Sequence, residues 1–292
     1  MSIRVRDLSF SYGTRRCEGS GRAGAYDVLR HIDVEFPDGE LVNVLGPNGA
    51  GKSTLFRCLL GLEEGYSGTV EVDGRDLRSM GARERARKIA YIPQSHDSVY
   101  DYSVLDVVLM STAPSVGVFG APSARERDRA WEALERVGIA RLAHRPATRI
   151  SGGEQQLVLI ARALAQDART IVMDEPTSAL DYGNTMRVLG CVRQLAREGL
   201  SIVQSTHQPD QAFLFADRVL ALDRGRVRAF GDPRGVITEE LVAELYGVDV
   251  SICSLFDDHV RVCVPSSEIQ DGWEGAPARA RKEEKGRPCR RR

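Results

Sequence analysis

The sequence predicts an α/β fold: a mostly parallel sheet that carries a phosphate-binding loop, with an antiparallel β subdomain and a helical insertion beside it. Three observations lead to this prediction. A glycine-rich pattern over residues 46–54 stands between a strand-like run and a helical run. Strand-like runs alternate with helical ones along much of the chain. Polar residues directly follow four of the predicted strands, at the ends where parallel sheets bind ligands.

The phosphate-binding loop fits the pattern G-x-x-x-x-G-K-[ST]. Its residues are Gly46, Pro47, Asn48, Gly49, Ala50, Gly51, Lys52, Ser53 and Thr54. Its glycines let backbone N–H groups close around a polyphosphate, and the start of the following helix favours negative charge. Lys52 can reach the β- and γ-phosphates, and the Ser53 hydroxyl can coordinate Mg²⁺. The alternative is a glycine-rich turn that ends in Lys-Ser by chance, which the flanking strand and helix disfavour.

The length, net charge and hydrophobic content of the chain indicate a globular protein and disfavour several other classes. The chain has 292 residues, a net charge of −1 and 42% hydrophobic residues, enough for one large domain with or without a small appendage. Dedicated nucleic-acid binders are usually distinctly basic, and this chain is not. The N-terminus carries no apolar signal segment, and no run approaches the ~18 to 20 apolar residues of a membrane span. We therefore expect neither secretion nor membrane insertion.

The six cysteines are scattered and form no C-x-x-C pair. We interpret them as reduced packing residues. A disulfide between Cys253 and Cys263, within a predicted hairpin, is the alternative.

The first third of the chain contains most of the predicted antiparallel sheet. A segment rich in Arg, Gly, Ser and Ala at 14–25 interrupts it and is expected to be a loop or insertion. Alternating and apolar runs predict strands at residues 3–12, 28–36, 41–45, 69–72 and 89–92. A charged helix is expected at 83–87.

The remaining two thirds alternate between helices and strands. Helices are predicted at 104–110, 124–137, 154–165, 183–198 and 238–246, and strands at 170–173, 201–206, 219–222, 227–230, 250–253 and 260–264. We divide the chain into a domain at 1–264, which includes a helical subdomain at about 95–165 and a C-terminal helix-hairpin extension at about 235–264. The basic tail at 265–292 is predicted to be disordered, with contact to acidic lipid headgroups as the alternative.

Four strand ends carry residues suited to phosphoryl transfer. Asp174 suits a carboxylate that holds Mg²⁺, and Glu175 can take a proton from an attacking water; an acidic cap or salt bridge is the alternative. Gln94 can offer its amide oxygen to Mg²⁺ and to the water, unless it simply faces solvent. His207 can donate to a γ-phosphate oxygen, although a lone histidine is more often structural.

A second glycine-rich helix start occurs at Ser151-Gly152-Gly153 and is a second potential anion site. One nucleotide already has its loop, so we infer that this second site serves a neighbouring subunit. A simple helix N-cap is the alternative.

These motifs together resemble the ATP-binding subunits of ABC transporters over roughly residues 2–264. The resemblance implies a P-loop NTPase core with ATPase activity. The matching motifs are the Walker A loop (46–54), the Q-loop glutamine Gln94, the signature (Ile150 to Gln155, with Ser151, Gly152, Gly153 and Glu154), Walker B with its catalytic Glu175, the D-loop with Asp181, and the switch histidine His207. Tyr12 resembles the aromatic residue that stacks on adenine, with Tyr26 as the alternative. The signature departs mildly from the family pattern at Ile150 and Glu154.

The resemblance further implies a head-to-tail homodimer that binds two ATP with Mg²⁺. Ser151, Gly152 and Gly153 of one subunit would cap the γ-phosphate held by the other. The subunit would sit peripherally at the cytoplasmic face of the membrane and drive permease subunits, themselves served by a substrate-binding protein. We expect docking at residues 95–110, chiefly at 100–104.

Within the family, the sequence after Gln94, the stretch 102–110 and the stretch 206–211 look like importers of metal complexes, with iron–siderophore or haem first. Cobalamin or molybdate/tungstate importers and exporters are alternatives. A non-transport ABC ATPase in DNA repair or translation usually has a long coiled coil or two nucleotide domains, and neither is evident here.

Overall fold

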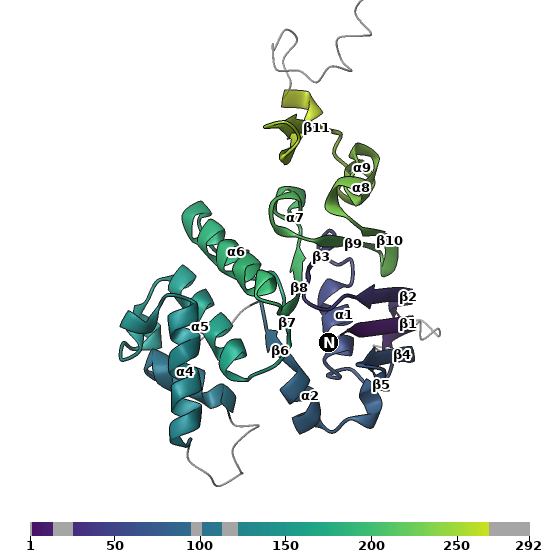
Figure 1. Ribbon diagram of the computed structural model, residues 1–292. Coiled ribbons are helices and arrows are strands. Elements are labelled where there is room, and N and C mark those ends of the chain that lie inside the picture. Colours follow the sequence, from purple (N-terminus) through teal and green to yellow (C-terminus); the bar gives the residue numbers. More distant parts are fainter. Residues whose placement is uncertain (1, 14–25, 95–100, 113–121, 269–292) are drawn as a thin grey trace, which may run out of the picture.

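A six-stranded sheet forms the centre of the molecule. The computed structural model describes residues 2–13, 26–94, 101–112 and 122–268, apart from the side chain of Tyr26 (Figure 1). The strand order is β10-β9-β3-β8-β7-β6, and every neighbouring pair is parallel except β9 with β10. The strands are β3 (Leu41–Leu45), β6 (Ile89–Ile92), β7 (Thr170–Met173), β8 (Ser201–Thr206), β9 (Arg218–Asp223) and β10 (Arg226–Gly231).

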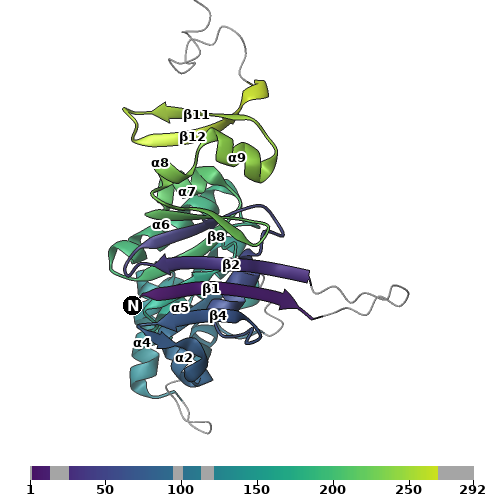
Figure 2. The ribbon, with the colours of Figure 1, turned by 90° about the vertical axis from the view of Figure 1, so that its right-hand side faces the viewer.

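A second, antiparallel sheet covers one face of the central sheet, as the sequence predicts (Figure 2). Its order is β2-β1-β4-β5, and its strands are β1 (Ile3–Tyr12), β2 (Tyr26–Phe36), β4 (Ser67–Val72) and β5 (Arg75–Asp76). Alternate side chains of β1, among them Ile3 and Val5, are buried toward the interior. This alternation is what a half-exposed sheet requires.

Helices cover both faces of the central strands, which explains their uninterrupted apolar sequences. On β3, Val42 and Val44 face a core shared with the antiparallel sheet and α1 (Lys52–Leu59), whereas Leu41 faces a core built with the helical side. The remaining helices of this part are α2 (Ala82–Lys88), α3 (Val104–Leu109), α4 (Ala124–Arg136), α5 (Gly152–Ala165) and α6 (Tyr182–Arg197). Short 3-10 helices occupy Leu77–Ser79, Met110–Thr112, Ala140–Leu142 and Ala147–Arg149.

The C-terminal part packs on the side of the central sheet that carries β9 and the edge strand β10. It contains α7 (Pro209–Phe215), α8 (Pro233–Val236), α9 (Glu239–Tyr246), the hairpin β11 (Val250–Leu255) with β12 (Val260–Pro265), and a 3-10 turn at Ser266–Glu268. Helix α7 contacts β12, and the Cys263 N–H donates to Asp210 Oδ1 at 2.8 Å.

Two details of the C-terminal part differ from the sequence prediction. The prediction omitted α7 and α8, although each has a proline in its first turn, a position that proline favours. The boundary predicted after residue 264 falls inside β12, because Pro265 still pairs with Val250.

Strand register also decides the question of the Cys253–Cys263 disulfide. Cys263 pairs with Ile252, and Cys253 pairs with Val262. Because neighbouring residues of a strand point to opposite faces, the two cysteines lie on opposite faces of the hairpin and both are free. Burial raises the pKa of the Cys263 thiol to about 12, which suits a packing residue.

No helix in the described ranges is both long enough and apolar enough to cross a membrane. The predicted loop at 14–25 and the tail after residue 268 lie outside the described residues.

Candidate active site

Four parallel strands end at the same edge of the central sheet and deliver the predicted residues to one place. Strand β3 runs into the phosphate loop, β6 is followed by Gln94, β7 by Asp174 and Glu175, and β8 by His207. A pocket of about 550 Å³ opens here, lined by Tyr12, Val28, Asn48, Gly49, Gly51, Lys52, Ser53, Thr54, Gln94 and Glu175. Val28 of β2 is the lining residue that the sequence did not single out.

Two glycines of the phosphate loop are required by close backbone contacts. A Cβ added to Gly46 would lie 2.2 Å from the Leu222 carbonyl oxygen of β9. Gly51 has a φ of 106°, a conformation that favours glycine, and it precedes α1 directly. The loop is also held from outside, because the Gly225 N–H donates to Ala50 O at 2.9 Å. These contacts with β9 and with Gly225 hold the backbone of the loop in place.

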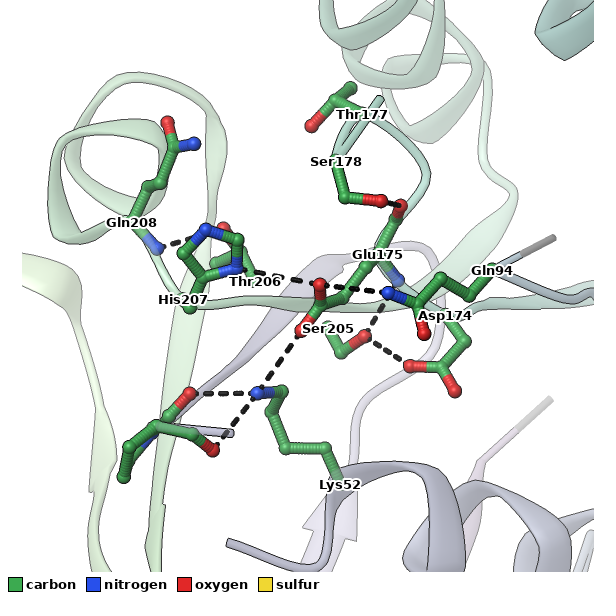
Figure 3. Close-up of polar contacts among 12 residues, drawn as sticks. Lys52, Gln94, Asp174, Glu175, Thr177, Ser178, Ser205, Thr206, His207 and Gln208 are labelled. Carbon is green, nitrogen blue, oxygen red and sulfur yellow. Dashed lines mark hydrogen bonds and ion pairs between the residues drawn. The ribbon is translucent and has the colours of Figure 1, made fainter. Parts of the chain in front are cut away.

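Lys52 crosses the floor of the pocket. Its ammonium group donates to the carbonyl oxygens of Gly46 (2.7 Å) and Pro47 (3.2 Å) and lies 3.3 Å from Glu175 Oε1 (Figure 3). The side chain is only 5% exposed, so a buried positive charge is compensated by two carbonyls and a carboxylate. A phosphate entering the loop must therefore replace part of this arrangement.

Glu175 is the centre of the polar cluster. Gln94 Nε2 donates to Glu175 Oε2 at 3.3 Å, and His207 Nδ1 lies 3.4 Å from the same oxygen without meeting hydrogen-bond geometry (Figure 3). Glu175 has a φ of 43°, a left-handed conformation that is costly for a non-glycine residue. Such strain persists where the surroundings impose it, as at functional sites. The structure thus brings Lys52, Gln94, Glu175 and His207 together.

Asp174 lies beneath this cluster and is 4% exposed. The Ser205 hydroxyl donates to Asp174 Oδ1 at 2.6 Å and accepts from the Glu175 N–H at 2.8 Å. Ser205, which the sequence analysis missed, therefore fixes both acidic residues. It lies within β8, two residues before His207, which follows this strand, and that position is the signal that could have found it.

The oxygen donors at this edge suit Mg²⁺. They are the Asp174 carboxylate, the exposed Ser53 hydroxyl and the Gln94 amide, and Mg²⁺ binds through one or two carboxylates together with substrate phosphates. The described residues contain no group of three His, Cys, Asp or Glu side chains that could hold a metal alone. A metal shared with a polyphosphate fits this donor set.

Tyr12 reaches the pocket from the end of β1. Its ring makes an edge-on contact with Phe10, with centroids 4.9 Å apart, and its hydroxyl lies 3.5 Å from Thr54 Oγ1. The side chain is 43% exposed, which leaves ring surface free for a flat ligand. The backbone of Tyr26 pairs with that of Tyr12, and the side chain of Tyr26 lies outside the described part.

The Ser151-Gly152-Gly153 segment begins α5, away from the pocket lining. Ser151 caps the helix: its hydroxyl accepts from the Glu154 N–H, and the Glu154 carboxylate accepts from the Ser151 N–H at 3.1 Å. This bond lowers the pKa of Glu154 below its ordinary 4.5. The capping box expected of a simple N-cap is therefore present, and it leaves further N–H groups of the first turn for a ligand.

The start of α6 packs against the start of α5. Asp181 caps α6 by accepting from the Asn184 N–H at 2.8 Å, a bond that also lowers the pKa of Asp181. A Cβ added to Gly153 would lie 2.2 Å from Asn184 Oδ1. Asn184, which the sequence analysis missed, thus connects the predicted signature with the predicted D-loop.

The predicted docking stretch is only partly suited to docking. Residues 95–100 lie outside the described residues. Tyr102 and Met110 are 44% and 50% exposed, but Val104 is fully buried in the core formed by α3 to α6. The inclusion of Val104 in the docking surface was wrong, because the side chain points into the helical core.

Known proteins are similar to this chain in sequence and in fold. The family model described as ABC transporter matches residues 29–178. A hemin import ATP-binding protein of Rhodococcus jostii is 38% identical over 78% of each chain. A molybdate import ATP-binding protein of Haemophilus influenzae is 36% identical over 75% of this chain and 81% of its own length. A cobalamin import ATP-binding protein of Halobacterium salinarum is 38% identical over 77% of this chain and 56% of its own length.

Solved structures agree. A structure described as an inward-facing metal-chelate type ABC transporter superposes with a TM-score of 0.77 at 31% identity, covering 90% of this chain and 96% of that one. A dimeric ATP-binding cassette in a post-hydrolysis state, bound to ADP and phosphate, gives a TM-score of 0.66 at 28% identity, covering 80% and 99%. The predicted fold class is confirmed by these likenesses.

Proposed function

The chain belongs to the ABC transporter family, as an ATP-hydrolysing ATP-binding subunit, and from this premise we propose that it energises the import of a metal complex, an iron–siderophore complex or haem first. The hemin import relative and the metal-chelate type structure support this cargo class. Relatives named for cobalamin and molybdate import make those cargoes, with tungstate, the second candidates.

The convergence of Lys52, Gln94 and His207 on Glu175, which lines the pocket, is the observation that carries the proposal. Glu175 takes a proton from the attacking water, and its contacts with Gln94 and His207 hold it near the position of a γ-phosphate. His207 donates to a γ-phosphate oxygen, and Lys52 neutralises phosphate charge. Tyr12 stacks on adenine.

Ser53, Gln94 and Asp174 would hold Mg²⁺ together with the phosphates. When bound, the ion neutralises charge on the transferred group and lowers the barrier to its displacement. Ser205 orients the Asp174 carboxylate for this task through its 2.6 Å hydrogen bond.

A second copy of the chain completes each ATP site in our proposal. The start of α5, Ser151 to Glu154, would meet the γ-phosphate bound to the partner, with Asp181 of the D-loop beside it. The dimeric cassette holding ADP and phosphate supports this arrangement. The capped N-terminus of α5 has the dipole and the N–H donors that an anion needs.

We further propose that residues 1–264 act as the ATP-binding domain. This domain includes a helical subdomain at about 95–165 and a helix-hairpin extension at about 235–264. Residues 265–292 form a basic tail after it. The subunit works at the cytoplasmic face of the membrane, where it drives permease subunits. A separate substrate-binding protein delivers the cargo to these permease subunits. Tyr102 and Met110 are the described exposed residues of the docking stretch.

Uptake by the reconstituted complex tests the cargo. The chain is co-purified with the permease encoded beside its gene, placed in liposomes with the matching binding protein, and supplied with labelled ferric siderophore, haem, cobalamin or molybdate. We expect ATP-dependent accumulation of an iron complex. Accumulation of cobalamin or molybdate alone would transfer the assignment to that cargo, and co-purification with ribosomes or DNA instead of a permease would contradict transport itself.

A further inference from the structure

We propose that Gln211, in the first turn of α7, is a positioning residue that holds His207 toward Glu175. The proposal rests on the role given to His207 above. Gln211 is 6% exposed and does not line the ATP pocket, so it would act through the chain on either side of His207.

Gln211 binds both neighbours of His207. The Thr206 hydroxyl donates to Gln211 Oε1 at 3.1 Å, and Gln211 Nε2 donates to Gln208 Oε1 at 2.8 Å. The same Thr206 hydroxyl accepts from the Gln208 N–H at 3.1 Å. One buried amide thus closes a ring of hydrogen bonds across His207.

Apart from its backbone, few contacts of His207 fix the orientation of its side chain. The ring is 41% exposed, and its Nδ1 atom lies 3.4 Å from Glu175 without a hydrogen bond in good geometry. The direction of the His207 side chain therefore depends on the backbone of residues 206–208. The hydrogen bonds that join Gln211, Thr206 and Gln208 constrain this backbone. Because the side chains of Thr206 and Gln211 are buried, removing one of them leaves the other with an unsatisfied polar group, which costs more than the loss of an exposed bond.

The ring also reaches the chain that follows Glu175. The Thr177 hydroxyl lies 3.5 Å from Gln211 Oε1, and Thr177 is 9% exposed. Gln211 therefore connects the loop after β7, which carries the base, with the loop after β8, which carries the histidine. Helix α7 is itself anchored from its other side, through the bond between Asp210 and the Cys263 N–H. Gln211 thus has a fixed frame from which to hold both loops.

Paired variants of Gln211 and Thr206 test this role. Gln211→Leu keeps a similar volume and removes every hydrogen bond of the side chain, while Gln194→Leu makes the same change at an exposed site on α6 as the control. We expect Gln211→Leu to lower kcat by on the order of ten- to a hundredfold, as misplacement of a catalytic group does, with the Kd for ATP within about threefold. Gln194→Leu should leave both values unchanged.

Thr206 supplies a second pair that preserves folding. Thr206→Val is isosteric and suits a strand, and it should reproduce the loss of kcat, whereas Thr206→Ser keeps the hydroxyl and should restore turnover to within about threefold. Equal turnover in Thr206→Val and Thr206→Ser, or an unchanged kcat in a folded Gln211→Leu, would overturn the proposal.

His207→Ala separates this inference from the function it rests on. If His207→Ala loses turnover and Gln211→Leu does not, the positioning role alone is wrong. If His207→Ala turns over normally, the role of His207 in the proposed function is wrong as well. If both single variants lose turnover, the double variant with His207→Ala and Gln211→Leu should be no slower than His207→Ala, because both changes act through His207.

Discussion

Lys52 Nζ lies 3.3 Å from Glu175 Oε1, so an ion pair joins the phosphate loop to the end of β7 across the pocket. In the chain without nucleotide, the lysine to which we assign phosphate binding and the glutamate to which we assign water activation neutralise each other. ATP must compete with the carboxylate for the lysine. The first two predictions concern the two ends of this pair.

Lys52→Ala should weaken ATP binding by about ten- to a hundredfold, because a charge-assisted bond to phosphate is worth roughly 1.5–3 kcal/mol. Titration with a fluorescent ATP analogue measures the Kd. Lys88→Ala is the matched control, since Lys88 pairs with Asp73 on the surface. An unchanged Kd in Lys52→Ala would contradict the role assigned to this lysine.

Glu175→Gln should retain ATP but lose turnover by about a hundredfold or more, because the amide cannot accept the proton of the attacking water. The neutral amide also no longer competes for Lys52, so affinity for ATP should not fall. Phosphate release measures turnover, and size-exclusion chromatography with ATP should show an accumulated dimer. Near-normal hydrolysis would remove Glu175 as the base.

Gly153→Ala should disrupt the junction between α5 and α6, because its Cβ would lie 2.2 Å from Asn184 Oδ1. We expect a lower melting temperature and reduced ATPase activity. Adding Asn184→Ala should recover part of both losses by removing the clashing amide. Gly190→Ala is the control, since a Cβ there meets nothing within 4 Å. A double variant no better than Gly153→Ala would exclude the Asn184 amide as the cause and leave the Asn184 Cβ, which would lie 2.8 Å from the added methyl group.

Tyr102→Ala should reduce coupled uptake in the reconstituted transporter while basal ATPase activity stays unchanged, because the exposed ring belongs to the proposed docking surface. Phe256→Ala, at an exposed ring of the C-terminal hairpin, is the control. Val104→Ala should instead lower stability, by on the order of 1 to 3 kcal/mol, since it creates a cavity in the helical core. Full uptake with Tyr102→Ala would remove this residue from the docking surface.

The capping box of α5 should respond to acid. The folded-state pKa of Glu154 is lowered by the Ser151 N–H, so its stabilisation is complete above the ordinary value of 4.5 and is lost as the pH falls through the folded pKa. The difference in melting temperature between the unchanged protein and Glu154→Ala should therefore be largest near neutral pH and shrink below about pH 4.5. A difference independent of pH would show that the carboxylate charge does not contribute.

Local patterns predicted most elements, because apolar periodicity, turn residues and the phosphate-loop glycines act over short stretches of chain. The strand ends at Gln94, Glu175 and His207 could be placed together because parallel strands share one carboxyl edge. Val104 was misassigned because its helical face depends on packing against α4 and α5, which no local pattern specifies. Gln211 could not be predicted because it contacts Thr177 and Thr206 in other segments, and Asn184 because its contact with Gly153 joins two helices.

The hydrogen bond between Asp210 and the Cys263 N–H couples the stability of the C-terminal hairpin to that of helix α7, which supports the active site. Opening of β12 would free the first turn of α7, and with it the frame on which His207 depends. We therefore expect the hairpin and the ATP site to open as one unit of local stability, so that fraying of the surface hairpin lowers the fraction of molecules that are ready to hydrolyse ATP.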